Sequence, residues 1–281
     1  MSLVAPSNLT SGIARIAARF ADNAAAGRKA VAPFVTAGDP DMKTTAEVLA
    51  GIDRGGATLI ELGVPYSDPI ADGAVIQASY VRALAHGMSI DRLFATVKDV
   101  TGHIATPVLA MVSYSIVYRR GIDRFVRESV AAGLAGFVVP DLPIEESDDL
   151  GAACEAAGLA LVRLVTPTTP PERAEKIARQ STGFLYCVSV AGVTGTRTSL
   201  PEGLVERVEW LRTKTSVPIL VGFGISTPEQ ATAVAAVADG VIVGSALVRH
   251  LADSAAAPQQ AVATIEQHVR DLVAAVEPTA T

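Results

Sequence analysis

Residues 59–73 read Leu59-Ile60-Glu61-Leu62-Gly63-Val64-Pro65-Tyr66-Ser67-Asp68-Pro69-Ile70-Ala71-Asp72-Gly73. The apolar start predicts a short strand, and Gly63 and Pro65 predict that the strand breaks into a loop. Side chains alternate between the two faces of a strand, so Glu61 points one way while Ile60 and Leu62 point the other. If Ile60 and Leu62 pack on covering helices, Glu61 points into the interior of the sheet.

A carboxylate at that position has two interpretations. Burying a charge is costly unless the group is paired, protonated or used in chemistry. Glu61 could be a buried residue that backbone groups and water satisfy. The adjoining loop, however, holds Asp68 and Asp72, and a second acid there could share a small pocket with Glu61. The pairing of acids favours a functional Glu61.

Composition indicates a folded protein and excludes several classes. The 281 residues are 49% hydrophobic with a mean hydropathy of +0.37, which predicts a single domain over residues 1–281. The net charge is -6 and the basic residues are scattered, which argues against nucleic-acid binding. No apolar run approaches the ~18 residues that span a bilayer. We therefore expect neither a nucleic-acid nor a membrane partner.

The cysteines and the N-terminus bear on location. Cys154 and Cys187 show neither metal-site spacing nor a disulfide framework, so we expect two buried, reduced thiols. The N-terminus lacks the basic start, apolar centre and small-residue cleavage site of a secretory signal. Together these features predict a cytoplasmic protein.

Outside the opening stretch, apolar strands alternate with amphipathic helices. Strands are expected at 30–35, 59–63, 107–112, 136–140, 159–164, 184–188, 218–222 and 240–244. Helices are expected at 8–26, 42–54, 74–86, 89–101, 121–132, 145–157, from about 171, and at 202–214, 227–236, 245–251 and 258–275.

Short, continuously apolar strands imply a parallel sheet that is covered on its outside. Eight strand–helix units in about 250 residues predict an α/β fold, a (β/α)8 TIM barrel with an extra N-terminal helix. The alternative is a doubly wound open sheet. That fold usually has fewer strands and a Gly-rich turn after the first, and the segment Thr36-Ala37-Gly38-Asp39-Pro40 is not such a turn.

A barrel predicts where ligands bind. Chemistry belongs to the loops after the strands, and phosphate to the loops after the last two strands. Gly222-Phe223-Gly224 and Gly244-Ser245 follow those strands and offer backbone N–H groups, although either pair alone could simply form a turn. The loop at 191–199 is rich in Gly and small hydroxyl residues. It is interpreted as a lid that closes over a ligand, with a long surface loop as the alternative.

Missing residues narrow the chemistry further. No lysine lies in a strand or at its C-terminal end, which argues against a Schiff-base aldolase. No His and carboxylate cluster indicates a metal, and no dinucleotide fingerprint is present, so we expect no metal and no cofactor. The acid–base groups at the mouth are Glu61, Asp68, Asp72, Asp141 and the Tyr186 hydroxyl. Cofactor-free proton transfer on a phosphorylated substrate is the predicted chemistry.

These residues resemble a known family, the tryptophan synthase alpha chain. Residues 59–73 are similar to its signature E-L-G-x-P-[FY]-S-D-P-x-x-D-G, and the similarity runs along nearly the whole chain. Further matches are Pro33-Phe34-Val35-Thr36-Ala37-Gly38-Asp39-Pro40, Pro140-Asp141-Leu142-Pro143-Ile144-Glu145-Glu146, Gly192-Val193-Thr194-Gly195, Gly222-Phe223-Gly224-Ile225-Ser226 and Gly244-Ser245.

The resemblance implies retro-aldol cleavage of indole-3-glycerol phosphate to indole and glyceraldehyde 3-phosphate, a step of tryptophan biosynthesis. It implies that Glu61 is the general acid–base, that Asp72 accepts the indole N–H, and that Tyr186 lines the same pocket. The other implied site residues are Phe34, Ile76 and Phe223 for indole, Gly195, Gly224, Gly244 and Ser245 for phosphate, and Asp141 and Thr194 for ordering the lid.

The resemblance also implies a partner, the beta chain, in an α2β2 heterotetramer. One segment departs from the family pattern, because Ser115 stands where Asn is usual, in a loop that lies near the beta chain. Two alternatives stay open: a stand-alone indole-3-glycerol phosphate lyase, and a non-catalytic phosphate-binding barrel that acts as a partner. The presence of both Glu61 and Asp72 argues against the non-catalytic role.

Overall fold

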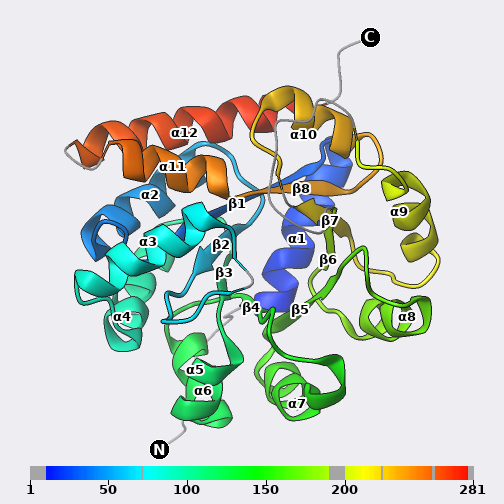
Figure 1. The fold of residues 1–281 in the computed structure, drawn as a ribbon, viewed down its shortest axis with the longest axis horizontal. Coiled ribbons are helices and arrows are strands. Elements are labelled where there is room, and N and C mark those ends of the chain that lie inside the picture. The colour runs from blue at the N-terminus through cyan, green and yellow to red at the C-terminus, as the bar shows by residue number, and fades with distance from the viewer. Residues whose placement is uncertain (1–10, 71, 190–199, 223, 255–256, 278–281) are drawn as a thin grey trace, which may run out of the picture.

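A computed structural model describes residues 11–70, 72–189, 200–222, 224–254 and 257–277. Eight parallel strands form a closed barrel in chain order, and β1 pairs with β8 to close it (Figure 1). The strands are β1 (Ala30–Thr36), β2 (Ile60–Gly63), β3 (Val108–Met111), β4 (Gly136–Val138), β5 (Ala160–Val165), β6 (Leu185–Val188), β7 (Ile219–Gly222) and β8 (Gly240–Val243). The predicted barrel is confirmed, and the open sheet is excluded.

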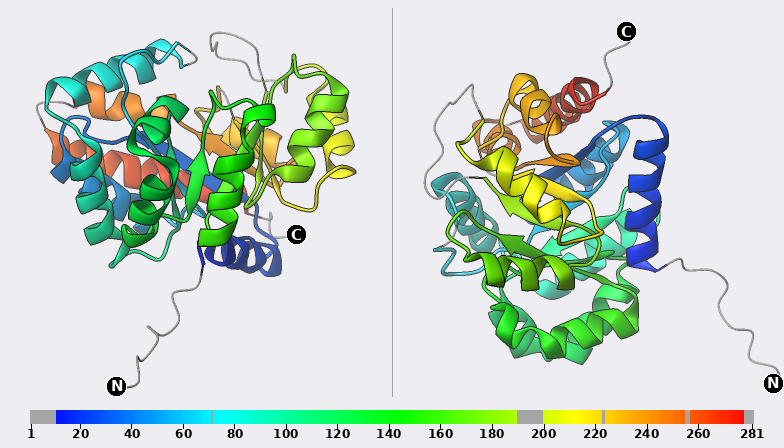
Figure 2. Two further views of the ribbon diagram at one scale, coloured as in Figure 1. Left: turned by 90° about the horizontal axis from the view of Figure 1, so that it is seen from below. Right: turned by 90° about the vertical axis from the view of Figure 1, so that its right-hand side faces the viewer.

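Helices surround the barrel on its outside (Figures 1 and 2). They are α2 (Met42–Arg54), α3 (Ala74–Ala85), α4 (Ile90–Thr101), α5 (Tyr114–Arg120), α6 (Ile122–Ala131), α7 (Asp148–Ala157), α8 (Pro171–Gln180), α9 (Leu204–Arg212), α10 (Pro228–Ala235), α11 (Ser245–Asp253) and α12 (Pro258–Ala275), with a 3-10 turn, η1 (Ile144–Glu146). Among the described residues, no helix is long and apolar enough to cross a membrane.

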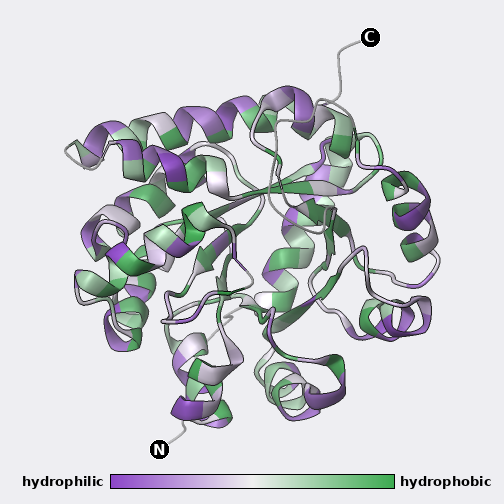
Figure 3. Ribbon diagram, viewed as in Figure 1, coloured by the Kyte–Doolittle hydropathy of each residue, from purple (hydrophilic) through white to green (hydrophobic). Residues whose placement is uncertain are grey.

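Strand side chains divide between two apolar layers. Ile60 and Leu62 belong to the large cluster that the strands share with the helices, whereas Leu59 and Leu109 belong to a second cluster inside the barrel. Figure 3 shows the resulting pattern, with apolar strands inside and helices that are polar on their outer faces. This alternation places Glu61, which shares a face with Leu59, on the inside.

The extra N-terminal helix is α1 (Gly12–Ala25), which begins where the Ser11 side chain accepts a hydrogen bond from the Ala14 N–H. Its apolar face packs on the cluster inside the barrel, with Ile16 fully buried there. The side chain of Arg19 donates to the Ala57 carbonyl at 2.7 Å. The helix therefore covers the end of the barrel from which the strands start, opposite the end where a barrel carries its site (Figure 2).

The sequence analysis did not predict one of the helices, α5. Only residues 121–132 are expected to be helical after the third strand, but α5 precedes α6 there. The Ser113 side chain accepts a hydrogen bond from the Ser115 N–H and caps α5, and Gly121, at φ 85°, separates the two helices. A helix of seven residues completes only about two turns, which is too short for a clear apolar period.

Candidate active site

Glu61 is fully buried on β2, beside Phe34 of β1 and Leu109 of β3 in the barrel register. Among the described residues, neither of its carboxyl oxygens has a hydrogen-bond partner. Burial raises the pKa of Glu61 to about 8. The side chain is therefore protonated at neutral pH, and it can both give and take a proton near that pH.

Asp72 lies in the loop between β2 and α3, one residue before the Gly73 that caps α3. Burial, followed by the charge of Asp141, raises the pKa of Asp72 to about 6. Asp72 is therefore ionised at neutral pH, unlike Glu61. The Gln77 side chain donates to the Asp72 carbonyl at 2.8 Å and to the Pro69 carbonyl at 3.1 Å, which holds the loop on the first turns of α3.

A cavity of about 660 Å³ opens at the strands' C-terminal end and continues along the loop after β5. Its lining includes three of the predicted site residues, Asp72, Asp141 and Tyr186. It also includes two tyrosines that the sequence analysis did not assign to the site, Tyr66 and Tyr80. Tyr186 is 7% exposed on β6, and its hydroxyl would lie 2.4 Å from a β-carbon on residue 222. Burial, and then the charge of Glu61, raise the pKa of Tyr186 well above its ordinary value, so the phenol stays neutral.

The residues proposed for indole form an apolar group beside this cavity. Phe34 and Ile76 belong to one buried cluster together with Tyr80 and Val248. Gly63 makes room for it, because a β-carbon there would lie 2.4 Å from Phe34 Cζ. Phe223, the third residue implied for indole, lies outside the described residues.

The phosphate candidates meet at the ends of β7 and β8. Gly224 adopts φ 83°, a conformation that favours glycine, directly after β7. Gly244 precedes α11, which begins at Ser245 and has no side-chain cap among the described residues. The first N–H groups of α11 are thus available to an anion. Gly195 and Thr194, implied for phosphate and for the lid, lie outside the described residues, as does the loop at 191–199.

Asp141, which follows β4, is tied to the start of α5. It accepts hydrogen bonds from the Ser113 hydroxyl at 2.6 Å and from the Tyr114 N–H at 2.8 Å. The hydroxyls of Ser113 and Ser115 lie 2.8 Å apart, so Ser115 belongs to the same network. These contacts fix the Asp141 carboxylate beside Asp72 in the cavity lining.

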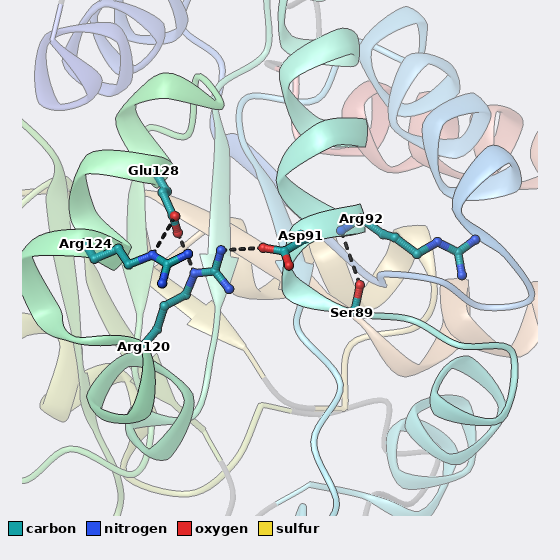
Figure 4. Close-up of polar contacts among 6 residues, drawn as sticks. All are labelled: Ser89, Asp91, Arg92, Arg120, Arg124 and Glu128. Carbon is teal, nitrogen blue, oxygen red and sulfur yellow. Dashed lines mark hydrogen bonds and ion pairs between the residues drawn. The ribbon is translucent and has the colours of Figure 1, made fainter.

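The other end of α5 is also held. Arg120, its last residue, bonds to Asp91 of α4 and to Glu128 of α6, and Arg124 joins Glu128 at 2.9 Å (Figure 4). The guanidinium of Arg120 also lies 5.6 Å from the centre of the Phe94 ring, within the range of a cation–π contact. The helix that carries Ser113 is therefore fixed at its far end by ion pairs.

Sequence reasoning missed Tyr80, Tyr66 and Ser113 as parts of this site. Tyr66 carried a signal, because it occupies the aromatic position of the 59–73 signature. Within the described ranges, no group of three or more His, Cys, Asp and Glu side chains is arranged to hold a metal ion. Both cysteines, Cys154 and Cys187, are buried away from this chemistry in the layer between strands and helices.

Comparison with known proteins agrees with this arrangement. The sequence profile described as "Tryptophan synthase alpha chain" matches residues 20–277. The chain is similar to the tryptophan synthase alpha chain of Rhodopirellula baltica, with 52% identity over 230 residues that cover 81% of this chain and 83% of the relative. The corresponding chain of Microcystis aeruginosa is 47% identical over 252 residues, covering 89% and 95%.

Solved structures give the same result. Tryptophan synthase subunit alpha from Legionella pneumophila superposes with a TM-score of 0.85 at 34% identity, covering 93% of this chain and 98% of that one. A chain of Mycobacterium tuberculosis tryptophan synthase gives a TM-score of 0.86 at 32% identity, covering 94% and 98%. By sequence and by structure, this chain belongs to the tryptophan synthase alpha chain family.

Proposed function

We propose that this chain is a carbon–carbon lyase that cleaves indole-3-glycerol phosphate to indole and glyceraldehyde 3-phosphate in tryptophan biosynthesis. One observation carries the proposal: the site pairs a buried acid, Glu61, with a second acid, Asp72, that ionises about two pH units lower. A retro-aldol cleavage needs a group that gives and takes protons and a group that stays anionic, and these two environments supply them.

Glu61 moves the protons. Its neutral carboxyl protonates the indole ring carbon that carries the glycerol chain, which leaves a cationic indolenine. The resulting carboxylate then takes the proton of the adjacent glycerol hydroxyl as that oxygen becomes the aldehyde. The carbon–carbon bond breaks, its electron pair returns to the ring, and Glu61 ends protonated as it began.

Asp72 supports the ring during these steps. It accepts the indole N–H, and its negative charge stabilises the positive charge that develops on the ring. The neutral phenol of Tyr186, which is buried within reach of the charges of Glu61 and Asp72, lines the same space. Phe34, Ile76 and Phe223 hold the indole.

The phosphate binds at the ends of β7 and β8, through backbone N–H groups of Gly224, Gly244 and Ser245. We propose that Gly195 adds to it from the lid, and that Asp141 and Thr194 order that lid. The reaction as written uses no metal or cofactor. The whole chain, 1–281, acts as one domain, and its two buried, unoxidised cysteines suit a cytoplasmic location.

The proposed partner is a beta chain, in an α2β2 heterotetramer, which docks on the face that carries the site. Two large apolar side chains are exposed on segments next to the site: Ile70, in the loop after β2, is 92% exposed, and Tyr118, on α5, is 71% exposed. We propose that Ile70 and Tyr118 are apolar contacts of that docking face, because aromatic and apolar side chains are enriched at the centre of protein interfaces. Both belong to segments that contribute to the site, the loop of Asp72 and the helix of Ser113.

Indole release from indole-3-glycerol phosphate tests the function. The purified chain should release indole, a beta chain should increase the rate, and Glu61→Gln should lower it by ~10²–10⁴-fold. Circular dichroism of Glu61→Gln should match that of the parent chain. Absence of indole release both alone and with a beta chain would support the non-catalytic barrel. Full activity alone with no response to a beta chain would support the stand-alone lyase.

A further inference from the structure

Tyr80 is a buried phenol in the cavity lining that the reaction described above does not use. It is 2% exposed, and among the described residues its hydroxyl has no hydrogen-bond partner. Among the described residues, this hydroxyl is not one of the fully buried polar atoms that lack a partner, so it opens to the cavity and can form a hydrogen bond there. Tyr66, which also borders the cavity, is partly exposed, and water can satisfy its hydroxyl.

Asp72 offers the complementary group. Its carboxylate also has no side-chain hydrogen bond among the residues that the structure describes, and it lines the same cavity. Both residues are carried by α3 and the loop that Gln77 holds against its first turns. Tyr80 lies one turn beyond Ile76 on one face of α3, and helical side chains lean toward the helix N-terminus. The phenol therefore leans back toward Asp72.

The structure fixes the position of this phenol. On one side of it, the hydroxyl of Ser79 lies 2.6 Å from that of Thr36 on β1. On the other, Arg82 makes two hydrogen bonds, of 2.9 Å and 2.7 Å, to Asp39, which is buried. These contacts anchor α3 to β1 and to the loop after β1. They hold the Tyr80 hydroxyl where it would lie 3.0 Å from a β-carbon on Gly63, at the end of the strand that carries Glu61.

We infer that Tyr80 is a positioning residue for Asp72: its phenol donates a hydrogen bond to the Asp72 carboxylate in the ligand-filled site, and so holds that carboxylate ionised against the indole N–H. This inference rests on the proposed function only for what the bond does in catalysis. The pKa of Tyr80 is raised well above its ordinary value by burial and then by the Asp72 charge, so the phenol keeps its proton and remains a donor.

Other ionisable groups surround Tyr80 and Asp72, so an experiment must distinguish their effect on the pKa of Asp72 from the effect of Tyr80. Within the described residues they are Glu61 on β2, Tyr66 and Asp68 in the loop after β2, Asp141 after β4 and Tyr186 on β6. Tyr66 is the competing donor, since its ring centre lies 5.8 Å from that of Tyr80. Tyr66→Phe is therefore the matched control for Tyr80→Phe, because each substitution removes one hydroxyl from the same cavity.

The direct measurement is a carboxyl-carbon NMR titration of the full chain with isotope-labelled aspartate, in the presence of glycerol 3-phosphate and indole. Asp72→Asn assigns the signal. Tyr80→Phe should raise the pKa of Asp72 by about one unit, which corresponds to the loss of one charged hydrogen bond, and Tyr66→Phe should raise it much less. An unchanged Asp72 titration in Tyr80→Phe, or an equal shift in Tyr66→Phe, would overturn the inference.

Turnover gives a second readout. In Tyr80→Phe, the acid side of the kcat profile should move up by the same unit, so kcat falls by up to about ten-fold at the acid end and little at the alkaline end. The melting temperature should stay close to that of the parent chain, because the lost hydroxyl has no partner in the fold. A loss of kcat that is equal at every pH would contradict the role, since a packing defect or a direct substrate contact gives that result. If the chain released no indole at all, the NMR titration would still decide the contact.

Discussion

The ring of Phe34 lies in the space that a β-carbon on Gly63 would take, 2.4 Å from Phe34 Cζ. Gly63 ends β2, two residues beyond Glu61, so its missing side chain lets an aromatic ring of β1 approach the strand that carries the acid. The indole subsite and the acid–base residue are therefore brought together by a glycine within the signature, and not only by the loop that follows it.

Gly63→Ala should damage the site more than the fold. The added methyl must displace the Phe34 ring, and misplacement of a substrate-positioning group by about 1 Å can cost ~10²-fold in rate. We expect kcat/KM for indole release to fall by ~10–100-fold. Gly102→Ala is the control, because Gly102 has ordinary α-helical dihedrals and ordinary contacts at the end of α4. Equal activities in the two variants would show that the approach of Phe34 is not needed.

The two acids predict a bell-shaped pH profile. Asp72 must be ionised, so kcat/KM should fall as the pH drops through about 6. Glu61 must be protonated to begin the reaction, so kcat/KM should also fall as the pH rises through about 8. The profile of kcat/KM reports the free enzyme, which is the state described by these pKa values. A profile that stays flat between pH 5 and pH 9 would refute this division of roles.

Asp141 should set the acid side of that profile. Its charge is the second cause, after burial, of the raised pKa of Asp72. Asp141→Asn removes the charge and keeps the shape, so the pKa of Asp72 should drop and the acid limb should move to lower pH. Ser113→Ala is a useful comparison, because it removes the 2.6 Å hydrogen bond to Asp141 and leaves the charge in place. An acid limb that moved upward in Asp141→Asn would contradict the electrostatic role.

The sequence predicts those parts of this site that depend on local pattern. The alternation around Glu61 indicates a buried acid, because Ile60 and Leu62 are apolar on either side of it. The position of Ser245 after the last strand predicts an anion-binding helix start, since barrels bind phosphate there. Both predictions follow from neighbouring residues in the sequence and require no knowledge of long-range packing contacts.

The parts that were missed depend on long-range contacts. Tyr80 is one residue in an ordinary amphipathic helix, and it enters the cavity only because Arg82 and Ser79 anchor α3 to segments about forty residues earlier in the chain. Helix α5 was missed because its seven residues are too few for a clear apolar period, and the Asp141 contact that holds its cap, Ser113, comes from the loop of another strand. Periodicity over a short window cannot reveal either contact.

The buried Glu61 makes the stability of the fold depend on pH. Its pKa is about 8 in the folded chain against an ordinary value of 4.5, so the folded state holds the proton more tightly than the unfolded state. The contribution of Glu61 to the free energy of unfolding is fully present below pH 4.5 and is lost as the pH rises through about 8. Between those values the loss is up to about 1.4 kcal/mol per pH unit. An uncharged residue at this position avoids that loss.

Glu61→Gln should therefore be more stable than the parent chain at neutral and alkaline pH, although it is nearly inactive. The difference in the free energy of unfolding, measured by urea denaturation at several pH values, should be small near pH 4.5 and should grow up to about pH 8. Glu172→Gln, an exposed substitution on α8, should leave the difference near zero throughout. If Glu61→Gln were destabilising by the same amount at every pH, the ionised carboxylate would have a partner in the folded chain. The acid would then be part of the structural framework of the barrel, and its burial would no longer indicate a proton-transferring group.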